Sequence, residues 1–429
     1  MKSNFFSFLN IKSLLFENKT LKQTIFKNTF WLWIAEVIDK TVAFLVAILL
    51  ARHFGPTIYG QWAFAISFVS LFTILVDFGF NALVVRELAK DKSKSAQYID
   101  NMLFMKVILG LITFGIIFFS VRFFGKDAEI LKLVYFLGIY IIINTFTTFF
   151  RSIFEASKKM QYETACRAAQ SFILLALVVF FALGKYPIFY FSIAYLSATL
   201  VASAISLVVI WNYFSKFFYR LDMKICREIL RKAWPFALGG MFVVVYFQVD
   251  TLMLSTMKTD SAVGWYNTAY TLFSGLLIVP GLLMASIYPE LSSSYSSSKE
   301  TFIKLYKNSL KYMCILSIII FPIFFIFAKP LILLLYGSLY INAIIIFRIL
   351  LSAGFFVYMN YVLSNVLYAI NKQMVYTGIM FFCLIMNIIL NFFLIPKYSY
   401  VGASIASVIP QVFLCLLLFI CVRKNLQIS

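Results

Sequence analysis

Three ionisable residues stand close together inside the first long apolar stretch of the chain. A helix turning about 100° per residue places Glu36, Asp39 and Lys40 within one arc of its surface. Glu36 and Lys40 have the i,i+4 spacing of an ion pair, with the acid first. One interpretation is a self-neutralised structural pair, and the other is a coupling-ion or substrate site on a cavity wall. Asp39 lacks an obvious partner on its own helix, which favours the functional interpretation.

Other charged residues lie deep in apolar stretches or at their ends. Asp250 is expected about 22 Å into its helix at 1.5 Å per residue, without a basic residue within a helical turn. It therefore predicts a cavity or a partner on another helix, since charges inside a bilayer are costly. Arg348 enters its helix near the outer end, where it could snorkel. Asp77 and Arg86 belong to the segment DFGFNALVVRE, in which Arg86 is either an interfacial cap or a phosphate ligand.

The remaining candidates lie near expected helix ends. Lys106 stands at the start of its predicted helix, and we expect it only to anchor that end. Arg151, together with Glu155 and Arg167, could form the inner mouth of a path. We expect no metal site and no catalytic residues, because the six cysteines form no CxxC motif and His53 is the only histidine.

The composition predicts which elements position these residues. The chain has 429 residues, of which 62% are hydrophobic and 13% charged, whereas a soluble domain carries roughly 25% charged residues. Lipid satisfies no backbone polar group, so the spans must be helices. At about 20 residues each, about twelve spans use nearly the whole chain and leave no soluble domain. They are expected at 29–50, 60–83, 103–120, 131–149, 167–183, 188–213, 235–257, 263–287, 310–327, 343–370, 373–395 and 401–421.

The net charge of +20 is a topology signal rather than a sign of nucleic-acid binding. With the N-terminus inside, Lys and Arg favour the inward segments by about three to one, as the positive-inside rule expects. Both termini are then cytoplasmic in a multi-pass protein of the bacterial inner membrane. The polar, basic start of the chain does not resemble a signal peptide.

A basic stretch at 216–234 divides the chain into two halves. We expect a cytoplasmic N-terminal segment (1–28), a six-helix lobe (29–215), the basic cytoplasmic linker, a second six-helix lobe (235–422) and a cytoplasmic tail (423–429). The halves share a short echo, FGPTIYGQWAFA at 54–65 and TDSAVGWYNTA at 259–269, which aligns Gly60 with Gly264. Six helices per half would make the repeat parallel, a known transporter plan. The alternative for so short an echo is chance.

Five segments together resemble Wzx-type polysaccharide flippases over almost the whole chain. Residues 49–90, LLARHFGPTIYGQWAFAISFVSLFTILVDFGFNALVVRELAK, are similar to that family's N-terminal signature, and 235–272 are similar to the start of its second half. LYGSLYINA (335–343), LYAINKQ (367–373) and NIILNFFLIPKYSYVGASIASVI (387–409) follow in the expected order. Their order and spacing, rather than any one motif, carry the resemblance.

The resemblance implies a member of the superfamily that includes multidrug exporters and the lipid II flippase. Its fold would be an all-α membrane protein with two parallel six-helix lobes forming a V around a central cavity. Its substrate would be an oligosaccharide on an undecaprenyl pyrophosphate carrier, moved by alternating access with a proton or sodium gradient and no cofactor. It also implies a cationic cavity, and Arg86 matches a recurrent family arginine. Membrane lipid, a polysaccharide polymerase and chain-length proteins are the expected partners.

We therefore expect a lipid-linked oligosaccharide flippase. The predicted phosphate and sugar ligands are Lys40, Arg86, Arg151 and Arg348, because arginine can bind phosphate bidentately. The predicted ion-coupling residues are Glu36, Asp39, Asp77 and Asp250. The alternative is a cation-coupled multidrug exporter of the same superfamily, and the charges of the predicted spans do not separate the two. A membrane glycosyltransferase or polymerase is disfavoured by the short loops and the absence of a nucleotide-binding motif such as GxxxxGK[ST].

Overall fold

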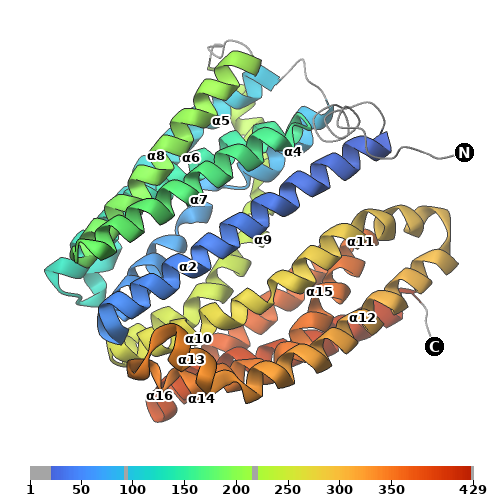
Figure 1. The fold of residues 1–429 in the computed structure, drawn as a ribbon. Coiled ribbons are helices and arrows are strands. Elements are labelled where there is room, and N and C mark those ends of the chain that lie inside the picture. Colours follow the sequence, from blue (N-terminus) through green and yellow to red (C-terminus); the bar gives the residue numbers. More distant parts are fainter. Residues whose placement is uncertain (1–20, 91–94, 215–220, 427–429) are drawn as a thin grey trace, which may run out of the picture.

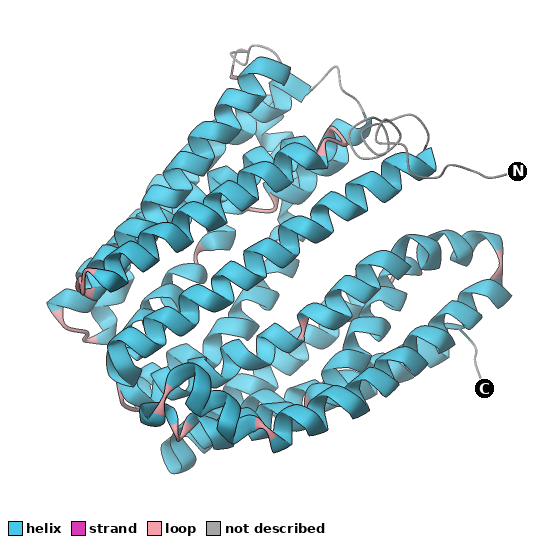
Figure 2. Cartoon of the chain, in the orientation of Figure 1, coloured by secondary structure: helices cyan, strands magenta, loops and turns pink. Residues whose placement is uncertain are grey.

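The fold is built from helices alone in the part of the chain that is described. The computed structural model describes residues 21–90, 95–214 and 221–426, and within these ranges there is no strand (Figure 2). Nine of the described helices are long and apolar enough to cross a membrane, or ten if one bent pair counts as a single span. The all-α membrane fold is confirmed.

The helices form two bundles that converge at one end and diverge at the other (Figure 1). The N-terminal bundle consists of α2 (Leu21–Ser70), α3 (Thr73–Asp77), α4 (Phe80–Lys90), α5 (Ser95–Ser120), η2 (Val121–Phe124), α6 (Ala128–Ala156), α7 (Met160–Leu183) and α8 (Ile188–Phe214). The C-terminal bundle consists of α9 (Met223–Met257), α10 (Asp260–Leu276), α11 (Ile278–Ser297), α12 (Lys299–Ile326), α13 (Ala328–Tyr336), η3 (Ser338–Tyr340), α14 (Ala343–Ser352), α15 (Gly354–Ala369) and α16 (Gln373–Leu426). The start of α2 and the connection between α11 and α12 lie on the diverging side.

Most helices are longer than their apolar stretches. α2 begins at Leu21, α9 at Met223 and α12 at Lys299, each well before its predicted start. Hydropathy detects only the lipid-embedded part of a helix, whereas the hydrogen-bonded turns continue into the polar region. The predicted boundaries at 28/29 and 234/235 therefore fall inside helices. The boundary at 215/216, and most of the predicted N-terminal segment, lie outside the described residues.

Two expected loops are sharp bends inside long helices. α2 runs through the expected break at 51–59 and bends at Gly55, whose φ of 73° and ψ of 176° suit glycine. α16 bends at Ser399, and α14 meets α15 at 45°. α16 combines two of the predicted spans, whereas α2 combines the first predicted span with the start of the second, which continues in α3 and α4. Each of the two long helices has a single residue with non-helical backbone angles at its bend. The number twelve stays a prediction.

The bundles meet at their converging end through a crossing of α2 and α10. A Cβ atom at Gly60 would overlap the carbonyl oxygen of Asp260, and a Cβ atom at Gly264 would overlap that of Pro56. Each glycine thus touches the residue four positions before the other glycine. The sequence echo aligned these same two glycines, so its equivalent positions meet each other across the interface.

Polar contacts repeat this symmetry. The hydroxyl oxygens of Thr57 and Ser261, each three positions before its glycine, lie 2.7 Å apart. Lys126, between η2 and α6, donates from Nζ to Asp260 Oδ1 over 3.1 Å. Tyr340 of η3 donates to the carbonyl oxygen of Ala51 over 2.7 Å. The converging end is therefore closed by backbone contact and by direct hydrogen bonds.

The helix α9 belongs to both bundles. Near its start, Lys232 Nζ lies 3.4 Å from Glu87 of α4, and Tyr98 of α5 donates to Glu228 over 2.7 Å. Cys226, Ile229 and Ala233 are buried in a hydrophobic cluster of the N-terminal bundle. The rest of α9 packs against α16 in the C-terminal bundle.

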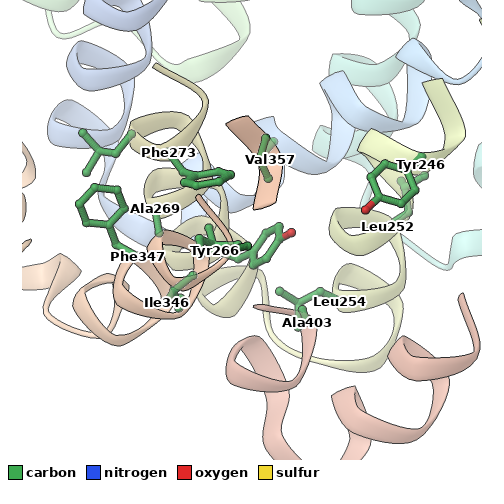
Figure 3. Packing of buried hydrophobic residues seen from close by; sticks show 14 of the residues in the cluster. Tyr246, Leu252, Leu254, Tyr266, Ala269, Phe273, Ile346, Phe347, Val357 and Ala403 are labelled. Atoms are coloured by element: carbon green, nitrogen blue, oxygen red, sulfur yellow. The ribbon is translucent and has the colours of Figure 1, made fainter. Parts of the chain in front are cut away.

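The hydrophobic core of the C-terminal bundle gathers around α10. Figure 3 shows Tyr266, Ala269 and Phe273 of α10 between side chains of α9, α14, α15 and α16. Tyr266 and Ala269 are almost fully buried. This packing fixes the face of α10 that points toward α9 and leaves the opposite face for the space between the bundles.

Candidate functional site

A cavity of about 1420 Å³ lies between the two bundles. α2, α6 and α7 line one wall, and α9, α10, α11 and α15 line the other. The lining includes Phe26, Phe30 and Trp33 of α2, and Leu282 and Pro289 of α11. Phe26 and Trp33 are about half exposed. The lining is thus mixed, with charged, hydroxyl-bearing, aromatic and aliphatic side chains.

Arg167 is the centre of a charged cluster on the N-terminal wall. Its Nη1 donates to Glu36 Oε2 over 2.9 Å, and its Nε lies 3.7 Å from Asp39 Oδ2 and 3.8 Å from Glu163 Oε1. Lys40 Nζ lies 3.9 Å from Glu36 Oε1. α2 and α7 pack side by side, and the i,i+3 and i,i+4 spacings put all these groups on facing surfaces. The predicted Glu36–Lys40 pair is present, and Asp39 finds its partner on another helix.

Glu163 is the most deeply buried acid of this cluster. The residue is 3% exposed, and its Oε2 has no hydrogen-bond donor among the described residues. Arg151 is 9% exposed, and it is close enough to Glu163 for the two charges to attract each other. Asp39 also accepts a hydrogen bond from Ser171 Oγ over 3.1 Å.

Acids outnumber bases on the cavity surface. Among the described residues, Glu36, Glu155, Glu163 and Glu290 line it on the acidic side, against Lys40 and Arg167 on the basic side. The family resemblance implies a cationic cavity, so this is a departure from the expected pattern. The reason is geometric: most of the predicted bases face elsewhere.

Asp250 forms a second, different site inside the C-terminal bundle. It is 5% exposed and accepts hydrogen bonds from Tyr266 Oη over 2.9 Å and Ser407 Oγ over 2.7 Å. Asn387 Nδ2 donates to it over 3.0 Å, and Asn391 Nδ2 also donates to it. The predicted partner on another helix is therefore confirmed, but it is a set of neutral donors.

A side pocket of about 220 Å³ beside this carboxylate lies next to the main cavity. Asp250 and Ser407 line the side pocket, and Tyr270 and Tyr361 line both spaces. Asn391 Oδ1 has no donor among the described residues. Asp250, Ser407 and Asn391 thus offer the oxygen ligands that hard cations prefer.

Asp77 and Lys106 form an ion pair within the N-terminal bundle. Lys106 Nζ lies 3.2 Å from Asp77 Oδ1, with a fully buried lysine side chain near the rings of Phe80, Phe146 and Phe149. The expectation that Lys106 only anchors a helix end was wrong, because α5 begins at Ser95 and the lysine lies well inside it. Asp77 is outside the set of cavity-lining residues.

The predicted phosphate ligands are scattered. Lys40 lines the cavity, whereas Arg151 is buried behind the wall. Arg86 pairs with Glu87 at 2.9 Å and stacks on Phe236. Arg348 lies over the ring of Phe325. The cavity geometry supports only Lys40 directly as a ligand, and the roles of the other three stay predictions.

Sequence reasoning missed several residues of both sites, including Glu163, and it placed Arg167 only at the inner mouth of a path. Glu163 and Arg167, at i,i+4 on α7, carry the same pair signal that drew attention to Glu36 and Lys40. Asn387 and Asn391, also i,i+4, are a polar pair in an otherwise apolar helix. In the described ranges no group of three or more His, Cys, Asp or Glu side chains could hold a metal ion.

Comparison with known proteins gives concordant results. A family model described as polysaccharide biosynthesis protein matches residues 25–295. A protein of Escherichia coli (strain K12) named "Putative O-antigen transporter" is 22% identical over 417 residues, covering 95% of this chain and 98% of that protein.

Solved structures share the fold at low sequence identity. The lipid II flippase MurJ in an inward closed conformation superposes with a TM-score of 0.77 at 16% identity, covering 92% of this chain and 88% of that chain. An inward-facing multidrug resistance MATE family transporter of the MOP superfamily gives 0.74 at 14% identity, covering 92% and 98%. The two-lobe arrangement with a central cavity is therefore a known fold.

Proposed function

Because the chain belongs to the polysaccharide biosynthesis protein family, we propose that it flips oligosaccharide repeat units linked to undecaprenyl pyrophosphate from the cytoplasmic to the periplasmic leaflet. It is a multi-pass membrane protein of the transporter class and not an enzyme. The O-antigen transporter name of its bacterial relative supports the glycan substrate and the inner membrane as its location.

The observation that carries this proposal is the mixed character of the cavity. A lipid-linked sugar has an anionic diphosphate, a polar glycan and an apolar tail. Charged and hydroxyl-bearing side chains line the cavity together with aromatic and aliphatic side chains of α2 and α11. The polar head can contact the charged and hydroxyl-bearing groups, and the start of the tail can contact the apolar ones.

The cavity size agrees with a large substrate. Sites for drug-sized ligands are roughly 300–1,000 Å³, and this cavity is about 1420 Å³. The additional volume suits several sugar rings. Eight aromatic residues among the described lining can stack on them: Phe26, Phe30, Trp33, Tyr59, Trp62, Phe247, Tyr270 and Tyr361.

The bundles diverge on the side where α2 begins, and Phe26, Thr29 and Phe30 near that end of α2 line the cavity. The basic residues predict that this side is cytoplasmic. On that assignment the structure is inward-facing, ready to accept substrate from the leaflet in which lipid-linked repeat units are made. The crossing of α2 and α10 then closes the periplasmic side.

Ion coupling is assigned to Asp250 in this proposal. A carboxylate in a protein interior with neutral oxygen-bearing neighbours can bind a proton or sodium ion, and charged groups inside membranes commonly serve such pathways. The side pocket supports access from the main cavity. Glu36, Asp39 and Asp77 remain further candidates for coupling.

A multidrug exporter is the second candidate, and one observation favours it. The excess of acids on the cavity surface would attract a cationic drug. The family membership and the bacterial relative favour the flippase.

The test is complementation in a bacterial host that lacks its own flippase for a defined surface glycan. We expect restored surface glycan and a fall in the lipid-linked repeat units retained on the cytoplasmic side. A panel of several glycans guards against a mismatched sugar. Failure with all of them, together with acquired resistance to cationic drugs, would establish the exporter instead.

A further inference from the structure

Arg167 and Lys40 are the basic side chains among the described residues of the cavity lining, and Arg167 is surrounded by carboxylates. Glu36, Asp39 and Glu163 all lie within 4 Å of its guanidinium. A diphosphate diester brings two negative charges to this wall. The incoming anion must therefore compete with the resident acids for the same cation.

We propose that the diphosphate head binds Arg167 together with a proton, which is taken up by Glu163. The proposal rests on the proposed function and assigns the head-group ligand and a protonation site within the cavity. The proton cancels one resident negative charge next to Arg167, and the phosphate oxygens replace the carboxylates as partners of the guanidinium.

The geometry of Arg167 leaves room for this exchange. Only the contact with Glu36 is a short hydrogen bond, at 2.9 Å, while the Nε contacts are 3.7 and 3.8 Å long. The Arg167 side chain is 24% exposed and lines the cavity. Its planar fork can donate two parallel hydrogen bonds to a phosphate group, which a lysine cannot do.

Glu163 is the acid best placed to take the proton. Its side chain is 4% exposed, against 36% for Glu36 and 41% for Asp39. Its Oε2 meets no donor among the described residues, so its desolvation is uncompensated. A proton on Oε2 relieves that cost and removes a negative charge 3.8 Å from Arg167 Nε.

The charges around Glu163 come from three helices. They are Glu36, Asp39 and Lys40 of α2, Arg151 and Glu155 of α6, and Arg167 of α7. With Glu163 this makes four acids and three bases, so one added proton brings the cluster to electrical balance. Four further titratable groups lie near it: Tyr140, Cys166, Tyr195 and Tyr361.

The proposed proton uptake predicts the direction in which the affinity for the head changes with pH. If the bound state holds one more proton than the free state, affinity for the head falls as pH rises, by up to about tenfold per pH unit. Glu163→Gln imitates the protonated acid. It should bind the head with the affinity that the unmodified protein reaches at low pH, and without the pH dependence.

The probe is farnesyl diphospho-N-acetylglucosamine, a soluble diester whose phosphates do not titrate near neutrality. Calorimetric titration of the full-length protein in nanodiscs, in two buffers of different ionisation enthalpy, counts the protons taken up. We expect about one proton per head between about pH 6 and pH 8. Glu163→Gln should take up none, and Glu129→Gln, an exposed acid at the far end of α6, should behave as the unmodified protein does.

Each outcome bears on a separate claim. Absence of binding by the unmodified protein, with several lipid-linked diphosphates, overturns the proposed function itself. Binding without proton uptake, or with an affinity that follows sodium rather than pH, overturns only the inference. Because the two-buffer measurement needs no variant, this holds even if Glu163→Gln folds poorly.

Discussion

The two bundles hold carboxylates near the same cavity and neutralise them by different means. In the N-terminal bundle, Glu36, Asp39 and Glu163 share one guanidinium through ion pairs of 2.9 to 3.8 Å. In the C-terminal bundle, Asp250 stands alone and accepts hydrogen bonds from hydroxyl and amide groups. In the first arrangement Glu36 and Asp39 are partly exposed, and two of the three ion pairs are longer than a hydrogen bond, at 3.7 and 3.8 Å. In the second arrangement the carboxylate is buried and accepts short hydrogen bonds.

This difference suggests two kinds of exchange. Where ion pairs border a cavity, an anionic ligand can take the place of the carboxylates, because the cation that they share remains available to it. A carboxylate surrounded by neutral donors can exchange only its own charge, by taking a proton or a small cation. We infer that the N-terminal bundle handles the substrate head, with the proton that accompanies it at Glu163, and that the C-terminal bundle handles the coupling ion at Asp250.

The largest effect is expected from Arg167→Ala. It leaves three acids without their shared cation and removes the head-group ligand, so glycan export should fall about 100-fold, as for truncation of a buried charge partner. Arg167→Lys should recover part of the activity, because it restores the positive charge but not the planar guanidinium group that can bind phosphate with two parallel hydrogen bonds. Arg122→Ala, at the exposed far end of the bundle, is the control. Normal export by Arg167→Ala at normal membrane levels would remove Arg167 from the head-group site.

A smaller effect is expected from Asp250→Asn. The substitution keeps the shape of the side chain, but it replaces one acceptor oxygen with a donating amide nitrogen and removes the negative charge, so export should fall about tenfold, the loss of one charge-assisted interaction. Export rates in vesicles with imposed proton or sodium gradients should lose their gradient dependence. Asp127→Asn at the exposed start of α6 is the matched control. Persistence of the gradient dependence would place coupling elsewhere, with Asp39 the next residue to test.

The smallest effect on export is expected from the double variant Asp77→Asn with Lys106→Met. Lys106→Met alone should lower stability by roughly 3 kcal/mol, because it leaves Asp77 without its cation in the protein interior. The double variant should recover most of that loss, as thermal unfolding in detergent would show. Its export should stay within about twofold of normal if the pair is structural. Lost export at recovered stability would instead make Asp77 a coupling residue.

The sequence predicted the class of fold because lipid imposes strong rules. Apolar stretches of sufficient length had to be helices, and the solitary Asp250 had to find a partner elsewhere. Both expectations are confirmed. The extent of α12 and the bends at Gly55 and Ser399 were not predicted, since hydropathy does not register polar helical turns or a one-residue bend.

The sequence predicted the contacts of the site that lie within one helix, but not those between helices. Glu36 and Lys40 pair within one helix, so their spacing was sufficient evidence. The contact of Asp39 with Arg167 depends on how α2 and α7 are rotated toward each other, which no local pattern specifies. For the same reason, the burial of Glu163 and the position of Arg348 over the ring of Phe325, outside the cavity lining, could be seen only in three dimensions.

The glycine crossing of α2 and α10 has a mechanical consequence. The arm of α2 from its start at Leu21 to the bend at Gly55 is about 50 Å long at 1.5 Å per residue, so tilting it by about 10° about the crossing displaces its start by about 9 Å. Close backbone contact at the two glycines makes the crossing a compact fulcrum, and the arm beyond it multiplies a slight rotation into a wide aperture. A single fulcrum can thus admit substrates of different width, with the range of accepted substrates determined by the swing of the arm.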